Sequence, residues 1–275
     1  WGSGNLSLLI NISTMKKRIL YIVIASIVSI NIHAQKTKET KADKQYNKFA
    51  YVDAIKTYER IIAKGYKTVN MLGCHDGIPV LDLKGKEVNG VYNKGLLDDA
   101  EIESVMNKIM ERGGRVKNLY DPSGKKISYY QINATFFSAL GEDEQKLLLA
   151  RAIQMFMPGI PQVWYLDIFA GKNNYEAADN GGSAGHKEIN RTTLSMQDIE
   201  QGLKTEIVNK QLEIIRLRNT SNAFSGQIEI NDAEEDILDI KWYNGANVAH
   251  LKANLKTKAF TIDHTENGLT TTMLF

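Results

Sequence analysis

Apolar residues recur every three or four positions in three segments of the chain, a spacing that is typical of helices with one buried face. The segments run from Asp98 or Asp99 to Gly113-Gly114, from Glu142 to Met157, and from about Ile207 to Arg218. An acidic residue at the start and glycine or proline after the end are ordinary helix boundaries, and Pro158-Gly159 ends the second segment. The pattern therefore predicts three helices.

Shorter apolar runs bounded by turn residues predict strands. Thr68–Leu72 and Ile160–Leu166 have the composition of buried strands. Beyond Gly226 the runs alternate, at 227–230, 237–243, 248–255 and 259–263, with turns at Asn244-Gly245 and Asn267-Gly268. Strands mixed with helices indicate α/β architecture, so we expect an α/β region at 68–225 and a small antiparallel β domain at 226–275.

The N-terminal part follows a different pattern. The basic triplet Lys16-Lys17-Arg18 precedes a run of 14 mostly apolar residues, Ile19–Ile32, and Ala34 offers a small residue for cleavage. Because a membrane-spanning helix needs about 20 apolar residues, a secretory signal peptide at 15–34 is favoured over an anchor. Residues 1–14 precede Met15 and are interpreted as an upstream leader.

Residues 35–67 are basic, with nine Lys or Arg against four Asp or Glu. The stretch Tyr46–Ile62 resembles the later part of a tetratricopeptide repeat, and a plain amphipathic helix is an equally good interpretation. One partial repeat does not bury its own face, since such arrays need about three. With the signal peptide, residues 15–67 resemble the start of flavobacterial OmpA-family envelope proteins, which implies the periplasm or outer membrane.

Composition excludes several classes of protein. With 43% hydrophobic residues among 275, the chain is not mainly disordered, and its length suggests one or two domains of about 150 residues. The 34 basic and 32 acidic residues leave a net charge of +2, which argues against a nucleic-acid partner. The single cysteine, Cys74, excludes an internal disulfide and a CxxC zinc site, so any metal would need oxygen ligands.

Candidate chemistry begins at His75-Asp76, which lies between glycines directly after the predicted strand Thr68–Leu72. In a β/α barrel the carboxyl ends of strands carry the catalytic residues, although an isolated His-Asp pair is as often structural. Three further motifs follow in order: Tyr129–Gly141, Pro158–Asn173 and Gly185–Arg191. This ordered set makes a functional interpretation stronger than the pair alone does.

Together these motifs resemble the C-terminal part of the sucrose phosphorylase group, in the α-amylase superfamily of glycoside hydrolases, over residues of about 68–275. The resemblance implies the C-terminal portion of a (β/α)8 TIM barrel followed by a small antiparallel β domain. It also implies a cytoplasmic enzyme without cofactor or metal, whose partners are an α-glucoside and inorganic phosphate. The product would be α-glucose 1-phosphate, formed with retention, and the parent enzyme is compatible with a homodimer.

The resemblance also implies roles for individual residues. Asp76 matches the carboxylate that stabilises the transition state, and His75 beside it would donate to the bound glucose. Arg191 matches an arginine that clamps glucose hydroxyls. Tyr130 and Gln131 match a mobile loop that exchanges the first leaving group for phosphate.

Some positions stay open. Ser128 stands where sucrose-specific members often carry an acid, which leaves the preferred acceptor undecided. Trp164 and Tyr165 either stack on sugar or belong to the core. Asp167 is either a site residue or a capping residue.

A retaining mechanism also needs a nucleophile and an acid/base carboxyl, and no residue of this chain matches either family motif. Two strands of the eight-stranded barrel are readable, so we expect an incomplete barrel and a chain that is inactive and poorly folded by itself. An export signal conflicts with intracellular phosphorolysis. The alternatives are a chimera joined near residues 67–70, an exported binding or structural protein, and an enzyme completed by a separate N-terminal fragment.

Overall fold

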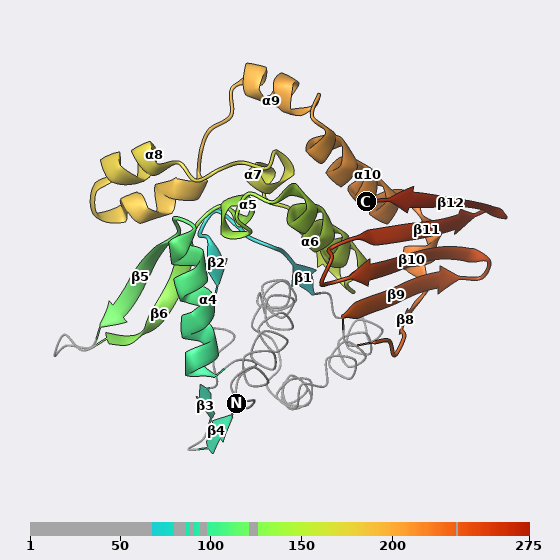
Figure 1. Cartoon of the computed structure of the whole chain (residues 1–275), viewed down its shortest axis with the longest axis horizontal. Helices are drawn as coiled ribbons and strands as arrows, with labels where there is room; N and C mark the ends of the chain where they lie inside the picture. Colours follow the sequence, from blue (N-terminus) through green and yellow to red (C-terminus); the bar gives the residue numbers. More distant parts are fainter. Residues whose placement is uncertain (1–67, 80–85, 89–90, 94–97, 121–125, 235) are drawn as a thin grey trace, which may run out of the picture.

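The computed structural model describes residues 68–79, 86–88, 91–93, 98–120, 126–234 and 236–275 (Figure 1). The predicted leader, signal peptide and repeat-like helices of residues 1–67 lie outside these residues. Among the described helices, none combines the length and the apolar composition needed to cross a bilayer.

Two short parallel strands lie at the centre of the α/β region. Strand β1 (Val69–Asn70) pairs with β7 (Ile160–Pro161). Backbone bonds from Ile160 N to Thr68 O and from Gln162 N to Asn70 O, both 2.8 Å, join them. Because these donors flank Pro161, its missing N–H costs no bond to β1. A parallel pair from distant segments is the arrangement of neighbouring barrel strands.

The predicted strand Ile160–Leu166 is wrong beyond its first residues. The chain leaves the pair after Gln162 and forms helix α7 (Tyr165–Ile168), with Trp164 at the N-cap position. The indole Nε1 of Trp164 donates to Asn190 O at 3.2 Å, and the Tyr165 hydroxyl donates to Thr192 O at 2.5 Å. These tertiary bonds hold the segment away from the extended path that its apolar composition favoured.

A second sheet was not predicted. Its order is β2 (Ile78–Pro79), β6 (Lys126–Asn133) and β5 (Arg115–Tyr120), all antiparallel. A separate hairpin joins β3 (Lys86–Val88) to β4 (Val91–Asn93). Figure 1 shows helix α4 (Asp99–Glu111) alongside β5 and β6.

The three predicted helices are confirmed with small changes at their ends. Helix α4 begins after Asp98, which forms a reciprocal capping box with Glu101. Helix α6 (Glu144–Phe156) begins two residues later than predicted, because Asp143 is the N-cap and Glu142 has a positive φ of 56°. Helix α10 (Glu206–Thr220) extends slightly beyond the predicted range.

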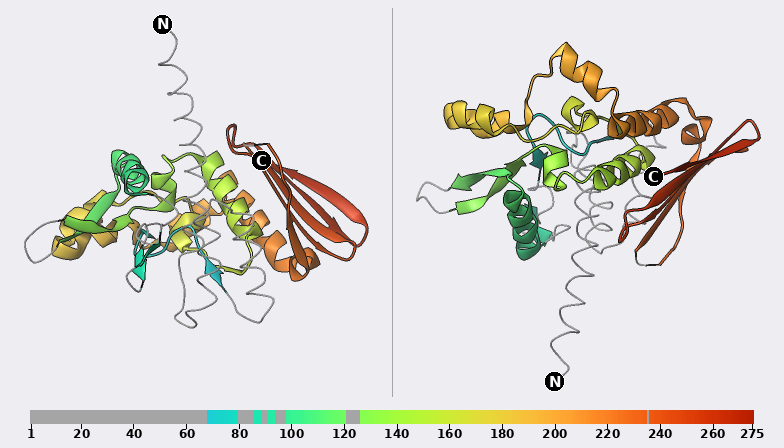
Figure 2. Two further views of the ribbon diagram at one scale, coloured as in Figure 1. Left: turned by 90° about the horizontal axis from the view of Figure 1, so that it is seen from below. Right: turned by 45° about the horizontal axis from the view of Figure 1, so that its top comes forward.

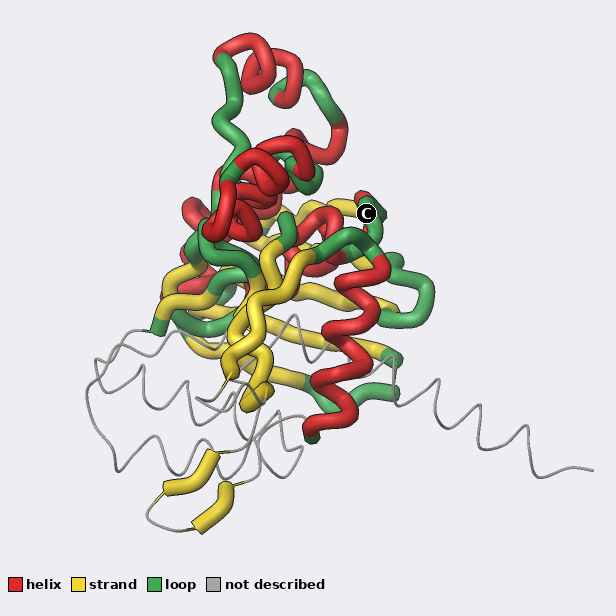
Figure 3. Tube along the Cα trace, turned by 90° about the vertical axis from the view of Figure 1, so that its left-hand side faces the viewer, coloured by secondary structure: helices red, strands yellow, loops and turns green. Residues whose placement is uncertain are grey.

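The remaining helical segments connect these elements. They are α5 (Phe136–Ala139), α8 (Tyr175–Asn180), the 3-10 segment η2 (Gly182–Asn190), α9 (Met196–Gly202) and the 3-10 segment η3 (Asn222–Ser225). Helix α9 stands out from the rest of the molecule on an extended connection (Figure 3).

The C-terminal region is a five-stranded antiparallel sheet in the order β12-β11-β10-β9-β8. The strands are β8 (Gln227–Ile230), β9 (Ile237–Asn244), β10 (Asn247–Asn254), β11 (Phe260–Glu266) and β12 (Leu269–Leu274). Four were predicted. The fifth, β12, was missed because most of its residues are exposed at the sheet edge and carry no buried alternation.

The hairpin turns are decided by backbone conformation. Asn267 and Gly268 have φ of 52° and 81°, as a two-residue hairpin loop needs, and this predicted turn is confirmed. The other turn is shifted by one residue, because Asn244 pairs with Asn247 and leaves Gly245-Ala246 as the loop.

One hydrophobic core extends from the α/β region into the β domain. Helix α6 packs against α10 and β10, and Figure 2 shows the five-stranded sheet beside these helices. At this junction the buried indole of Trp242 donates from Nε1 to Phe156 O at 2.8 Å. The bond satisfies the one polar atom of a side chain that otherwise packs as a hydrophobe.

Candidate active site

A tight turn at Cys74–Gly77 follows strand β1 and the buried residues Met71 and Leu72. It is closed by bonds from Gly77 N to Cys74 O at 2.9 Å and from Cys74 N to Gly77 O at 3.3 Å. Gly77 has φ of +100°, and an added Cβ would lie 2.2 Å from Ile132 O, so the position requires glycine. The turn leaves the side chains of His75 and Asp76 58% and 40% exposed.

Strand β6 contacts this turn through Ile132 and Asn133. The side-chain Nδ2 of Asn133, which is fully buried, donates to the backbone oxygen of Asp76 at 2.8 Å. The close approach of Gly77 to Ile132 lies on the same strand. The backbone of Asp76 is therefore fixed by a partly buried hydrogen bond, which lowers the freedom of its carboxylate.

The end of η2 clamps the turn from the other side. Each of three consecutive turn residues accepts at least one hydrogen bond from this segment. The bonds run from Asn190 Nδ2 to Cys74 O at 2.7 Å, from Arg191 Nε to His75 O at 3.0 Å, and from Lys187 Nζ to Asp76 Oδ1 at 3.2 Å. Residues more than 100 positions apart in the chain thus form one site.

Positive groups surround the Asp76 carboxylate. Its Oδ1 accepts from Lys187 and from Arg191 Nη2, the latter at 3.1 Å, and its Oδ2 lies 3.2 Å from His75 Nε2. Partial burial alone would raise the pKa of Asp76. The hydrogen bond from Lys187 and the charges of His75, Lys187 and Arg191 outweigh burial and lower this pKa, so the group is a carboxylate at neutral pH.

Arg191 spreads its guanidinium over three protein partners. Besides His75 O and Asp76, it contacts Glu188, whose Oε1 accepts from Nη1 at 3.1 Å. Among the described residues, three of its five N–H donors are used in this way. The predicted role in clamping glucose stays a prediction, and the geometry adds that Arg191 braces the turn.

Trp164 belongs to the surroundings of this site rather than to the core. Its ring lies 5.9 Å from that of His75, tilted by 50°, and 4.5 Å from that of Tyr165. Its bond to Asn190 O joins it to the segment that clamps the turn. Trp164 is half-buried, so the interpretation as a core residue is wrong, while stacking on sugar stays a prediction.

Asp167 lies in helix α7, next to Gly73 just before the turn. Its side chain is buried, and Oδ1 accepts from Phe136 N at 3.4 Å. Burial raises the pKa of Asp167 to about 6, although the positive charge of Arg151 opposes the shift. A Cβ added at Gly73 would lie 3.6 Å from Asp167 Oδ2, which has no hydrogen-bond partner among the described residues. Asp167 is thus a buried carboxyl that bonds to the start of α5 and lies next to Gly73, just before the turn.

Cys74 is half-buried within the turn itself. Its burial, together with the nearby charges of Asp76 and Asp167, raises the pKa of the thiol against the opposing backbone hydrogen bonds. A thiol with a raised pKa is a weak nucleophile, so the chemistry of the turn rests on its carboxylate.

Tyr130 and Gln131 lie in strand β6, and the expectation that they belong to a loop is wrong. Gln131 pairs with Pro79 on one side and Lys117 on the other. The loop was implied by the resemblance, whereas here β6 pairs with its neighbour β5 on one side and with the distant β2 on the other. The roles of both residues in exchanging leaving group for phosphate stay predictions.

Sequence reasoning missed Lys187, Asn190 and Asn133 as parts of the site. The signal was present, since Lys187 and Asn190 lie in the motif Gly185–Arg191 and Asn133 lies in Tyr129–Gly141. Their partners in the turn are distant in sequence and give no local pattern. Within the described ranges, no group of three or more His, Cys, Asp or Glu is arranged to hold a metal ion.

Known proteins with related sequences point to one family, although no protein-family model matches the chain. The sucrose 6(F)-phosphate phosphorylase of Ilumatobacter coccineus is 58% identical over 212 residues, which cover 77% of this chain and 40% of that protein. The sucrose 6(F)-phosphate phosphorylase of Thermoanaerobacterium thermosaccharolyticum is 37% identical over 203 residues, 72% and 39% of the two chains. The sucrose phosphorylase of Streptococcus mutans is 35% identical over 209 residues, 74% and 40%.

The same family is found by structure. The crystal structure of sucrose 6F-phosphate phosphorylase from Thermoanaerobacter thermosaccharolyticum superimposes with a TM-score of 0.65 at 35% identity, covering 75% of this chain and 41% of that one. The chain spans about two fifths of the length of these relatives. Its described elements form part of a (β/α)8 barrel followed by a small antiparallel β domain. The C-terminal part of this chain belongs to the sucrose phosphorylase group of the α-amylase superfamily.

Proposed function

We propose that this chain contributes the C-terminal part of the active site of a retaining glycoside phosphorylase. The reaction transfers a glucosyl group from an α-glucoside to inorganic phosphate and yields α-glucose 1-phosphate. The observation that carries the proposal is the ionised Asp76, held in the turn that follows the parallel strand β1 by Lys187, Arg191 and His75. The phosphorylase relatives support the choice of reaction.

The geometry suits the charge that this reaction develops. Breaking a glycosidic bond passes through an oxocarbenium-like transition state, which a fixed carboxylate stabilises. Asp76 is fixed through its backbone by Asn133 and through its carboxylate by cationic groups, so little reorganisation is needed. In this proposal His75 and Arg191 bind the glucose hydroxyls, and Tyr130 and Gln131 take part in the exchange of leaving group for phosphate.

Sucrose 6F-phosphate is the donor that we propose, with sucrose as the second choice. The relative at 58% identity is a sucrose 6(F)-phosphate phosphorylase. The neutral Ser128 is consistent with this choice, because an acidic residue at that position would repel a phosphorylated leaving group.

The test exchanges one segment of a relative. Residues 68–275 replace the matching C-terminal segment of the Ilumatobacter coccineus enzyme, which provides the two carboxyls that a retaining mechanism also needs. We expect release of α-glucose 1-phosphate, faster from sucrose 6F-phosphate than from sucrose. Asp76→Asn should lower kcat by about 100-fold to 1,000-fold, as loss of a preorganised electrostatic group does.

The matched control is Asp232→Asn, which changes an exposed aspartate of the β domain and should leave kcat unchanged. Full activity of the Asp76→Asn protein, or a folded exchange protein that forms no α-glucose 1-phosphate, would contradict the proposal. The unmodified chain is assayed in parallel, and we expect no phosphorolysis from it.

A further inference from the structure

Lys187 contacts the Asp76 carboxylate across 111 positions of sequence, and nothing in the sequence patterns assigned it a role. Its Nζ lies 3.2 Å from Oδ1, and its side chain is 31% exposed. The question is whether this is a fortuitous surface ion pair, of the kind that contributes little, or a built part of the site.

The position of Lys187 is set by its neighbours rather than by its own ion pair. Ile189 is fully buried, and Asn190, which is 1% exposed, binds Cys74 O through its side chain and Trp164 through its backbone oxygen. The backbone that carries Lys187 is therefore anchored to the same turn that carries Asp76. An anchored backbone restricts the positions that the lysine side chain can reach. An ion pair on a free surface has no such restriction.

Lys187 and Arg191 differ in the number of partners that they bind besides Asp76. Both donate to Oδ1 of Asp76, but Arg191 is shared with His75 O and Glu188. Among the described residues, the ammonium group of Lys187 makes its ion pair with Asp76. The other carboxylate oxygen, Oδ2, contacts the exposed His75.

We propose that Lys187 is a positioning residue: it holds the Asp76 carboxylate in its charged form and in a single orientation. The catalytic part of this inference rests on the proposed glucosyl transfer, in which Lys187 acts through Asp76. The effect of Lys187 on the charge and orientation of the Asp76 carboxylate follows from their contact and does not depend on the proposed reaction.

The proposal has a direct electrostatic consequence. Among the described residues, the ionisable groups that face Asp76 include His75 and Cys74 on its own turn, and Lys187 and Arg191 from the η2 side. After the opposing effect of burial, the hydrogen bond from Lys187 is the largest contribution and lowers the pKa of Asp76. Removing the ammonium group must raise this pKa, because the charged carboxylate loses a favourable partner.

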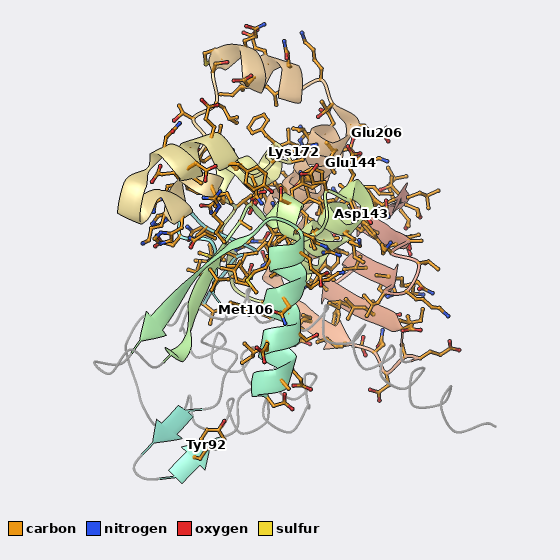
Figure 4. All side chains as sticks on the ribbon, turned by 60° about the vertical axis from the view of Figure 1, so that its left-hand side comes forward. Tyr92, Met106, Asp143, Glu144, Lys172 and Glu206 are labelled. Atoms are coloured by element: carbon orange, nitrogen blue, oxygen red, sulfur yellow. The ribbon has the colours of Figure 1, made fainter. Side chains whose placement is uncertain are left out.

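The first experiment uses the full chain and does not depend on catalysis. Isotopically labelled aspartate reports each carboxyl by NMR during a pH titration, and Asp76→Asn identifies the Asp76 signal. We expect Lys187→Met to raise the pKa of Asp76, and Lys187→Arg to restore it toward the wild-type value. The control is Lys172→Met, since Lys172 is 67% exposed and pairs with Glu142. Lys172 is labelled in Figure 4.

An unchanged pKa of Asp76 in Lys187→Met would overturn the proposal. If that variant loses the native spectrum, Lys187→Gln keeps most of the side chain's volume and polarity, and the same unchanged pKa in it would have the same meaning. Equal shifts in the Lys187 and Lys172 variants would also overturn it, because the effect would then be one of net charge.

The second experiment measures catalysis in the segment-exchange enzyme. Lys187→Met should lower kcat more than it changes KM and should move the acidic limb of the pH profile to higher pH, while Lys187→Arg recovers both. If the exchange enzyme with Lys187 intact is inactive, the proposed function fails. If it is active and Lys187→Met alters neither kcat nor the pH profile, the assignment of Lys187 alone fails.

Discussion

Single residues decide whether the turn Cys74–Gly77 forms, and Gly77 is the clearest case. Its φ of +100° and the 2.2 Å approach of an added Cβ to Ile132 O combine two penalties, one of conformation and one of space. We expect Gly77→Ala to lower the free energy of unfolding by about 2–4 kcal/mol, because both the turn and strand β6 must shift. Urea unfolding of the full chain measures this.

Gly268→Ala is the matched control for that substitution. Gly268 has a φ of +81°, but nothing lies within 4 Å of its added Cβ, so only the conformational penalty of about 1 kcal/mol applies. Equal losses in the two variants would show that the close contact with Ile132 is unimportant.

Asp167 makes stability depend on pH. Its folded-state pKa of about 6 lies above the ordinary value of 3.8, so the folded chain binds this proton more tightly than the unfolded chain does. Between these two values the free energy of unfolding therefore falls as pH rises. We expect Asp167→Asn, which keeps an oxygen for Phe136 N, to flatten this dependence when unfolding is measured at pH values across the interval.

The difference between the pH profiles of wild type and Asp167→Asn reports the contribution of Asp167, because the other carboxyls titrate in both proteins. Asp76 acts in the opposite direction, since its lowered pKa favours folding as pH rises. Parallel pH profiles for wild type and Asp167→Asn would contradict the assignment of a raised pKa to Asp167.

At the scale of elements, η2 and β6 hold the turn between them. The bond from Asn190 Nδ2 to Cys74 O is 2.7 Å long, and the Asn190 side chain is buried. Asn190→Ala removes this bond while Cys74 O keeps the one from Gly77 N, and we expect a loss of about 0.5–1.5 kcal/mol in the free energy of unfolding. Hydrogen exchange in 182–191 should become faster, as the segment separates from the turn.

The control for η2 is Ser195→Ala. Ser195 caps α9 through exposed bonds with Asp198 and makes no described contact with the turn. Its loss should speed exchange only within α9. Faster exchange at η2 in this variant too would mean that the two segments unfold together and that Asn190 has no separate role.

The elements themselves were predictable to different degrees. Helix α4 was predicted because its cap, apolar face and glycine stop are all local features. Strand β2 was missed because its partner β6 is distant in sequence, so that pairing rather than composition makes it extended, while β5 and β6 were missed although they are neighbours in the chain. The segment of helix α7 was predicted as a strand because a short apolar run fits either element, and bonds to Asn190 and Thr192 decided between them.

At the scale of the whole molecule, the β domain and the barrel portion share one core. Trp242 is buried against Phe156 and Phe224 at this junction, and Arg218 stacks over the rings of Phe224 and Trp242 at 4.5 and 5.2 Å. Burial lowers the pKa of Arg218 to about 10, so it stays charged at neutral pH and binds Gly159 O. Arg218 thereby joins Gly159, the residue before β7, to Trp242 of the β domain.

The sequence by itself determined three helices, four strands of the β domain and the family, because caps, turns and ordered motifs such as Gly185–Arg191 are written in consecutive residues. It also identified His75, Asp76 and Arg191 as one candidate set through that resemblance. Only the tertiary structure decided that Lys187 and Asn190 clamp the turn, that Asn133 supports it from β6, and that Asp167 is buried behind it. The reason is physical: charge, burial and hydrogen bonding depend on distances in space, and these partners lie far apart along the chain.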